Sequence, residues 1–182
     1  SETFRQTAHL LMGLIGAGIV LRLDAGAFVF LSAVLVARFL VCDAFTRGYD
    51  LPVLSRILDE SERTGEVPLK GAIGALFCLA VFGREYAAAG LVTVGMLDSI
   101  STLVGLRFGR HTLRDSKPLE GTLTGVAAVA LALAFLIPWW AATVVAAAAG
   151  IVEAFFPLED NVAVQVGACV TLAVVRIVMP GW

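Results

Sequence analysis

Seven long runs of apolar residues alternate with shorter polar segments along the 182-residue chain. The runs cover approximately 8–23, 26–42, 70–84, 86–106, 122–137, 139–156 and 162–179. A membrane-spanning helix needs roughly 20 apolar residues, and fewer where the bilayer is thin or a water-filled cavity lies nearby. The pattern therefore predicts an all-α, polytopic integral membrane protein with about seven transmembrane helices.

Positive charge is distributed unevenly over the polar segments. If seven spans cross the membrane and the N-terminus is cytoplasmic, most basic residues lie on the cytoplasmic side. They are Arg5, Arg47, Arg56, Arg63, Lys70, Arg107, Arg110, Arg114 and Lys117. The opposite side keeps only Arg22, Arg84 and Arg176. Because Lys and Arg concentrate in cytoplasmic loops, this bias predicts a cytoplasmic N-terminus, with 43–69 and 107–121 as cytoplasmic loops.

Composition supports a membrane setting and narrows the classes of function. Hydrophobic residues make up 59% of the chain, charged residues 15%, and the mean hydropathy is +0.90. Such a chain has too few polar residues to cover a soluble core. The formal net charge of −2, without a basic stripe, gives no indication of nucleic-acid binding. No P-loop, Rossmann glycine pattern or internal repeat occurs, so we expect one membrane domain over residues 1–182.

Ionisable residues within the apolar runs are the first candidates for function, because a charge at membrane depth is costly. Asp98 lies near the cytoplasmic end of the fourth run, on a helical face shared with Gly95 and Thr102. The neighbouring glycine would let a ligand approach the backbone closely. The structural alternative is an acid that pairs with an arginine and holds two helices together.

A compact polar loop follows the fourth run and mixes cations, an acid and glycines. Its residues of interest are Arg107, Gly109, Arg110, Arg114, Lys117, Glu120 and Gly121. Cations bind phosphate, and glycines let backbone amides come close to it. Basic residues at the end of a span also set topology, and an acid in a first helical turn also complements the helix dipole. We expect Lys117 and Glu120 to act in the functional site.

Three oxygen-bearing side chains follow on the same side of the membrane. Glu153 interrupts the sixth run, and Asp160 and Asn161 open the seventh. Carboxylate and amide oxygens suit Mg²⁺, so we expect these residues, with Asp98, to hold Mg²⁺ together with nucleotide phosphates. For Asp160 the alternative is a helix N-cap. His9 begins the first run, where both a structural and a functional role are consistent with its position.

These residues, in this order, resemble the polyprenol kinase family of membrane enzymes, which includes dolichol kinases, phytol kinases and CTP-dependent diacylglycerol kinases. The resemblance covers most of the chain and rests on Arg5, His9, Gly13, Lys70-Gly71, Asp98, Gly105, Gly109, Lys117, Glu120-Gly121, Glu153 and Asp160-Asn161. Two positions depart from the family pattern. Leu97 stands where glycine is usual, and Pro118 stands where a hydroxyl residue is common.

The resemblance implies transfer of the γ-phosphoryl group of CTP to the hydroxyl of a membrane isoprenoid alcohol, such as a dolichol or polyprenol, with Mg²⁺. The partners would be a nucleoside triphosphate, a lipid alcohol and the membrane, and an oligomer is compatible with this interpretation. Asp98, Lys117 and Glu120 would carry out the transfer, with Asp98 as the acceptor of the hydroxyl proton. The nucleotide would contact His9, Lys70, Arg107, Gly109, Arg110, Arg114 and Gly121.

Three other functions use similar residues. A CTP-dependent diacylglycerol-type kinase differs only in its alcohol, and a cytidylyltransferase that forms a CDP-lipid needs a similar metal and triphosphate site. Kinases release CDP, whereas a cytidylyltransferase releases pyrophosphate. An ion-coupled transporter would use the acids as an ion path, which calls for polar residues spread through the membrane depth. The acids of this chain gather on one side instead.

Overall fold

The computed structural model describes residues 2–23, 26–46, 66–113, 117–155 and 160–182, apart from the side chains of residues 42, 45–46, 66–69 and 160. In these ranges the fold is all-helical, as predicted: α1 (Glu2–Arg22), α2 (Gly26–Thr46), α4 (Glu66–Phe82), α5 (Arg84–Phe108), α6 (Leu119–Leu133), α7 (Trp139–Phe155) and α8 (Asp160–Val178). Each predicted apolar run coincides with one of these helices. Most of the predicted loop 43–69 lies outside the described residues, and its ends belong to α2 and α4.

Three of the described helices, α1, α5 and α8, are long and apolar enough to cross a membrane. This is fewer than the seven spans predicted from the sequence. The apolar stretches of α2, α4, α6 and α7 span only 10–17 residues, and in α2 the stretch is Gly26–Val41. At 1.5 Å per residue, a helical stretch of that length is shorter than a hydrocarbon core of about 30 Å. These four helices are therefore apolar, but their apolar stretches are shorter than a full span.

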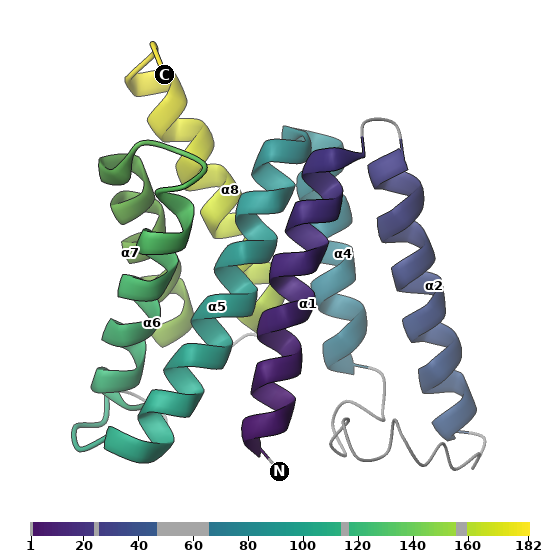
Figure 1. Cartoon of the computed structure of the whole chain (residues 1–182), viewed down its shortest axis with the longest axis horizontal. Helices are drawn as coiled ribbons and strands as arrows, with labels where there is room; N and C mark the ends of the chain where they lie inside the picture. Colours follow the sequence, from purple (N-terminus) through teal and green to yellow (C-terminus); the bar gives the residue numbers. More distant parts are fainter. Residues whose placement is uncertain (1, 24–25, 47–65, 114–116, 156–159) are drawn as a thin grey trace.

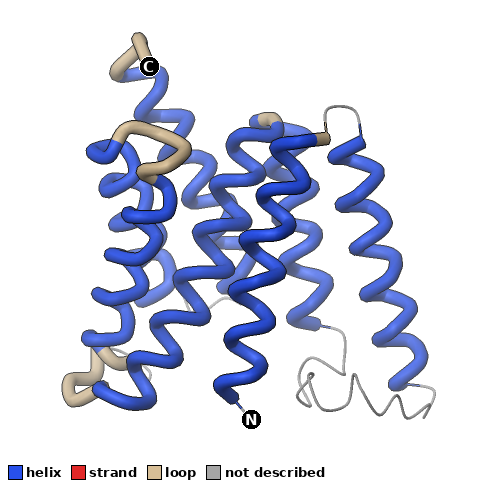
Figure 2. The backbone as a smooth tube through the Cα atoms, viewed as in Figure 1, coloured by secondary structure: helices blue, strands red, loops and turns tan. Residues whose placement is uncertain are grey.

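Helix α5 lies at the centre of the bundle and packs against α1, α4, α6 and α8. Figure 1 shows α5 between α1 and α6, with α8 behind α5, α4 behind α1 and α2 at one edge. The tube view in Figure 2 shows the helices running side by side, with the two chain ends at opposite ends of the bundle. One tight turn joins α4 to α5 at Gly83, whose φ of 97° favours glycine. Asp98 and Arg107 therefore project from a helix that most of the others contact.

Close crossings between the helices depend on glycine. A Cβ atom on Gly13 of α1 would lie 2.9 Å from the Cα atom of Gly95 in α5, so the two backbones touch. On the other side of α5, a Cβ on Gly121 of α6 would overlap the carbonyl oxygen of Ser101 and lie 3.1 Å from the Cα of Gly105. Small residues permit such approach where apolar burial no longer drives association. They hold α5 in register with α1 and α6.

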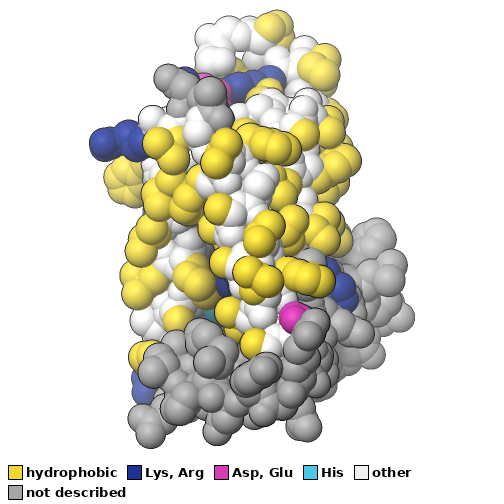
Figure 3. Space-filling view, turned by 90° about the vertical axis from the view of Figure 1, so that its right-hand side faces the viewer, with side chains coloured by type: hydrophobic (Ala, Val, Ile, Leu, Met, Phe, Trp, Pro, Cys, Tyr) yellow, Lys and Arg dark blue, Asp and Glu magenta, His cyan; other side chains and the backbone are white. Residues whose placement is uncertain are grey.

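Large hydrophobic side chains cover the outside of the bundle. In Figure 3 they dominate the middle of the visible face, and charged side chains lie mainly toward its ends. Among the most exposed are Phe135, Ile177 and Trp139, at 91%, 78% and 74%. The core is filled largely by alanines and valines of α5 and α7. An apolar exterior around a small-residue core is typical of helices that pack in lipid.

Candidate functional site

The crossing of α1 and α5 brings His9 and Asp98 together. His9 precedes Gly13 by one helical turn, and Asp98 follows Gly95 by a similar distance, so both lie on the same side of the glycine contact. The Nδ1 atom of His9 lies 3.8 Å from Oδ2 of Asp98, an ion pair when the ring is protonated. Both side chains are partly exposed. The predicted site residues His9 and Asp98 are therefore neighbours.

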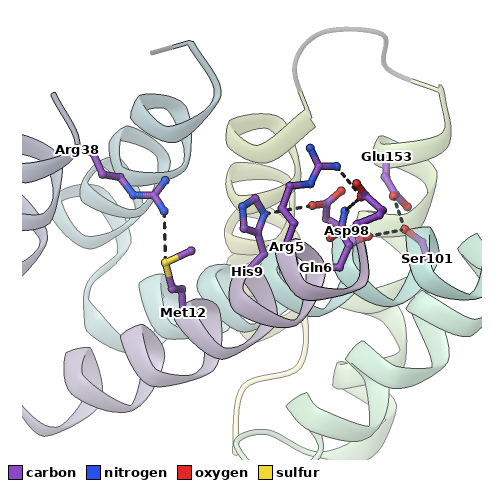
Figure 4. A network of polar contacts seen from close by, with 9 residues as sticks. Arg5, Gln6, His9, Met12, Arg38, Asp98, Ser101 and Glu153 are labelled. Carbon is purple, nitrogen blue, oxygen red and sulfur yellow. Dashed lines mark hydrogen bonds and ion pairs between the residues drawn. The ribbon is translucent and has the colours of Figure 1, made fainter. Parts of the chain in front are cut away.

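Polar residues of the first α1 turns extend this pair. Arg5 donates a hydrogen bond of 2.6 Å to Oε1 of Glu2, and Gln6 donates one of 2.8 Å to the same oxygen. Gln6 is buried. Figure 4 shows Arg5, Gln6 and His9 projecting from α1 beside Asp98 of α5. The N-terminal end of the bundle thus holds a network of two acids, two basic side chains and one amide.

A pocket of about 290 Å³ opens beside the His9–Asp98 pair. Helices α1, α2, α4, α5 and α8 all contribute to its wall, which is mostly apolar. Polar side chains line it at His9, Arg38, Asp98, Asn161 and Gln165. The volume is close to the lower limit of typical ligand pockets, about 300 Å³. The carboxylate of Asp98 and the amide of Asn161, both predicted metal ligands, therefore share one cavity.

A second polar contact links α5, α7 and the loop before α6. The hydroxyl of Ser101 donates a hydrogen bond of 2.9 Å to Oε1 of Glu153, and it lies 3.2 Å from the backbone oxygen of Asp98. The ammonium of Lys117 donates a hydrogen bond of 2.8 Å to the backbone oxygen of Glu153. Glu153 itself is buried, at 7% exposure. Ser101 thus connects Asp98 with Glu153, and Lys117 is bonded to the backbone of the same Glu153.

The position of Lys117 has a structural consequence as well. Glu153 lies in the last turn of α7, where carbonyl oxygens lack partners within the helix and the helix dipole is negative. An ammonium bonded to such a carbonyl stabilises the helix end. Lys117 therefore anchors the loop to α7, and its charge remains close to the buried carboxylate.

Glu120 takes part in a different arrangement, within the predicted cytoplasmic loop. Its Oε2 accepts hydrogen bonds from the backbone amides of Arg110 and His111, at 3.1 and 3.3 Å. Its Oε1 lies 2.7 Å from Nδ1 of His111. The His111 ring, followed by the amides of Glu120 itself and of Arg110, lowers the pKa of the Glu120 carboxyl from 4.5 to about 2. Glu120 thus shapes the loop as an ionised carboxylate.

The other predicted residues of this region have varied surroundings. Arg107 and Arg110 are exposed near the end of α5, where a solute has access to them. Gly121 is packed against the backbone of α5, so close helix contact accounts for this glycine. A Cβ atom on Gly109, at the end of α5, would overlap the carbonyl oxygen of Gly105 and lie 2.7 Å from the Cβ of Pro118. Lys70 lies in α4, next to the pocket-lining Gly71.

Two predicted site positions are not described. Arg114 and the side chain of Asp160 lie outside the described residues, so their predicted roles remain predictions. In the part of the chain that is described, no three His, Cys, Asp or Glu side chains gather closely enough to bind a metal by themselves. Mg²⁺ commonly takes only one or two carboxylates and completes its shell with phosphates and water. Asp98 and Asn161 in one pocket fit that requirement.

The arrangement includes side chains that were not predicted to belong to the site. Ser101 is one of the hydroxyl residues directly after Asp98, and that position was its only signal in the sequence. Gln165 is the one amide side chain in the run 162–179, and Arg38 is a charge within the second run. All three interrupt apolar segments, which is a usable signal for a functional role.

No protein-family model, curated protein or solved structure matches this chain. The resemblance to polyprenol kinases therefore stays a prediction.

Proposed function

We propose that this chain is a membrane-embedded kinase that transfers the γ-phosphoryl group of CTP to the hydroxyl of a lipid alcohol. The observation that carries the proposal is the Asp98–His9 pair at the margin of an otherwise apolar pocket. Apolar walls suit the hydrocarbon of a lipid, and a carboxylate suits its hydroxyl. The resemblance to the polyprenol kinase family adds the nucleotide, and taken alone, without the polar lining of the pocket, it favours an isoprenoid alcohol.

In the proposed reaction the lipid oxygen forms a bond to the γ-phosphorus. The bond from that phosphorus to the β–γ bridging oxygen breaks, and CDP leaves with the bridging oxygen. The Asp98 carboxylate accepts the hydroxyl proton. His9, 3.8 Å away, restrains the orientation of that carboxylate. Phosphoryl transfer depends mainly on such positioning and on neutralising charge.

The cations near the end of α5 are the proposed contacts of the triphosphate. Arg107 and Arg110 are exposed there, and Lys117 is held beside Glu153. Asp98 and Asn161, with Glu153 and Asp160, would hold Mg²⁺, which when bound neutralises charge on the phosphates. The hydrogen bond that the Ser101 hydroxyl donates to the buried Glu153 carboxylate would keep α7 and α5 in register while the nucleotide binds.

We also propose that all seven described helices cross the membrane, with the N-terminus and the active site on the cytoplasmic side. The apolar exterior supports a lipid environment for the short helices as well as for α1, α5 and α8. Short helices cross where flanking residues reach the interface or the bilayer thins. The asymmetry of basic residues supports the orientation.

The test is an assay of purified protein in liposomes with γ-labelled CTP and a panel of isoprenoid alcohols and diacylglycerols. A labelled lipid monophosphate, with release of CDP, is the expected result. Release of pyrophosphate with a CDP-lipid would assign a cytidylyltransferase instead. No nucleotide binding at all, together with cation flux through the liposome membrane, would replace the kinase with a transporter.

A further inference from the structure

Gln165 of α8 is a polar side chain in an apolar wall. It lines the pocket and is 1% exposed. Neither its Oε1 nor its Nε2 atom has a hydrogen-bond partner among the described residues. Buried amide groups are nearly always hydrogen-bonded, because leaving them unpaired is costly. An amide at the wall of a cavity without a protein partner indicates a ligand that supplies one.

Two glycines make room for this side chain. A Cβ atom on Gly74 of α4 would overlap Oε1 of Gln165. A Cβ on Gly90 of α5 would lie 3.6 Å from the Cβ of Gln165 and 3.5 Å from its backbone oxygen. Helices α4 and α5 therefore both approach α8 closely at this residue. The recess holds the carboxamide in place, which is a condition for selective recognition.

The pocket is accessible from the bundle surface. Met12 and Ile15 line it and are also 45% and 59% exposed. Phe30, Leu31 and Val34 of α2 form the facing wall. In a membrane this opening between α1 and α2 faces the lipid, so an amphiphile enters with its chains still in hydrocarbon. The volume of 290 Å³ accommodates a polar head and the first part of its chains.

The polar groups of the pocket specify the chemistry of the amphiphile. At the N-terminal end of the bundle, the Asp98 carboxylate accepts a hydrogen bond from a hydroxyl, and His9 restrains that carboxylate. Gln165 requires a second polar group, because its Nε2–H donates only to an acceptor. An ester carbonyl beside a free hydroxyl provides that acceptor. An isoprenoid alcohol has only hydrocarbon beyond its hydroxyl and would leave the carboxamide unpaired.

We propose that Gln165 is the lipid-recognition residue of this pocket and selects an acylglycerol, with an ester carbonyl beside its free hydroxyl, over a plain isoprenoid alcohol. The proposal that this pocket binds an acylglycerol does not depend on the kinase function. Only the role of the acylglycerol as phosphoryl acceptor rests on the proposed kinase function. Nε2 of Gln165 donates to the ester carbonyl while the hydroxyl lies at Asp98.

The test measures lipid binding to the full chain in dodecyl maltoside, a detergent without ester groups, and without nucleotide. Three probes compete: a diacylglycerol, the dialkylglycerol ether with chains of equal length, and geranylgeraniol. The ether keeps the hydroxyl and the chains but lacks the carbonyls. We expect the diacylglycerol to bind about tenfold more tightly than either of the others, the factor that one hydrogen bond provides. Equal binding of ester and ether would overturn the proposal without any mutation.

Two variants with matched controls locate the effect. Gln165→Leu is expected to lower diacylglycerol affinity about tenfold and to leave ether affinity unchanged. Ser99→Ala removes a buried hydroxyl without a partner among the described residues and outside the pocket lining, and should change neither affinity. Gly71→Leu places a side chain in the pocket, where no described atom lies within 4 Å of a Cβ at this position. It should weaken the binding of all three probes. Gly18→Leu is its control on α1, outside the pocket lining.

The outcomes separate the two proposals. An equal loss of ester and ether binding in Gln165→Leu would mean that Gln165 supports the fold, and would reject its role in recognition. Unchanged binding in Gly71→Leu would reject the pocket. Selective binding without any lipid phosphate from labelled CTP would reject the kinase and keep the lipid site. Transfer to ester and ether lipids at equal rates would keep the kinase and reject Gln165 as the selective residue.

Discussion

The two ends of the bundle use similar residues in different ways. At the C-terminal end, Arg176 of α8 donates a hydrogen bond of 2.8 Å to Glu85 of α5. Its guanidinium also lies 5.1 Å from the ring centres of both Tyr86 and Trp182. The ring of Trp140 meets Trp182 edge-on at 5.8 Å. None of these residues lines the pocket, so this cluster joins helices and the chain end to one another.

At the N-terminal end the acids and bases border a cavity. Asp98 and His9 are 3.8 Å apart and both line the pocket, and Gln165 lines the same space. The residue types of an ion pair therefore do not show whether the pair belongs to a functional site. What distinguishes the two ends is whether polar atoms face an opening that a ligand can enter. We therefore infer a structural role for Arg176 and propose a functional one for Asp98.

The largest expected effect comes from Asp98→Asn, which keeps the shape of the side chain and removes the proton acceptor. Loss of a general base lowers a rate by about a hundredfold or more, so we expect lipid phosphate formation to fall by at least that factor. The rate with γ-labelled CTP measures it, alongside Glu85→Gln as the matched acid at the other end. Near wild-type turnover in Asp98→Asn, or an equal loss in Glu85→Gln, would remove the functional contrast between the ends.

Lys117→Met retains the apolar stem and removes the ammonium. A charge-assisted hydrogen bond is worth about 1.5–3 kcal/mol, so CTP affinity should fall about tenfold or more. Calorimetry with CTP and with phosphate-free cytidine measures the difference. If both ligands lose affinity equally, Lys117 acts through its bond to the Glu153 carbonyl and the end of α7 alone.

Gly121→Ala tests the packing that positions the site. The new Cβ overlaps the carbonyl oxygen of Ser101, so α6 must shift away from α5. Overpacking costs about 1–3 kcal/mol, and we expect a lower unfolding temperature in detergent. Gly18→Ala, with no described heavy atom within 4 Å of the new Cβ, is the control. An unchanged melting temperature for Gly121→Ala would show that the contact between α5 and α6 is not tight in solution.

Arg176→Met should affect stability and not transfer. The partners Glu85 and Arg176 are partly exposed, and exposed ion pairs and cation–π contacts contribute about 0.5–1 kcal/mol each. We expect a small fall in unfolding temperature with a normal rate of lipid phosphorylation. A selective loss of transfer would assign function to the C-terminal end and reverse the comparison.

The smallest expected effect is a shift in the titration of Glu120. Its folded-state pKa is about 2, lowered mainly by His111, so the carboxylate stabilises the loop above pH 4.5 and loses this effect as pH falls toward 2. Carboxyl NMR of labelled protein should show a midpoint near pH 2. In His111→Ala the midpoint should rise toward 4.5. A wild-type midpoint near 4.5 would show that the loop contact does not form.

Much of the fold was predictable because each helix of this chain depends mainly on residues that are close together in the sequence. Apolar runs of sufficient length and composition determine helices whatever their neighbours are, and each predicted run coincides with a described helix. Asp98 and Glu153 were also recognisable as candidates, because a charge in an apolar segment is rare. Lys117 was a candidate as a cation of the polar loop after the fourth run. The end of α6 was less predictable, since apolar residues continue past the helix end after Leu133.

Contacts between distant residues depended on the tertiary structure. The chain has 18 glycines, and the pattern does not show that Gly13 meets Gly95 while Gly121 meets Ser101 and Gly105. Those two crossings decide that His9 faces Asp98 and that Ser101 reaches Glu153. They also turn Glu120 toward His111 in the loop. The sequence by itself determined an apolar helical chain with acids and bases concentrated toward one end. Only the packing of small residues, which depends on the shapes of both partners at once, decided which polar groups share a cavity.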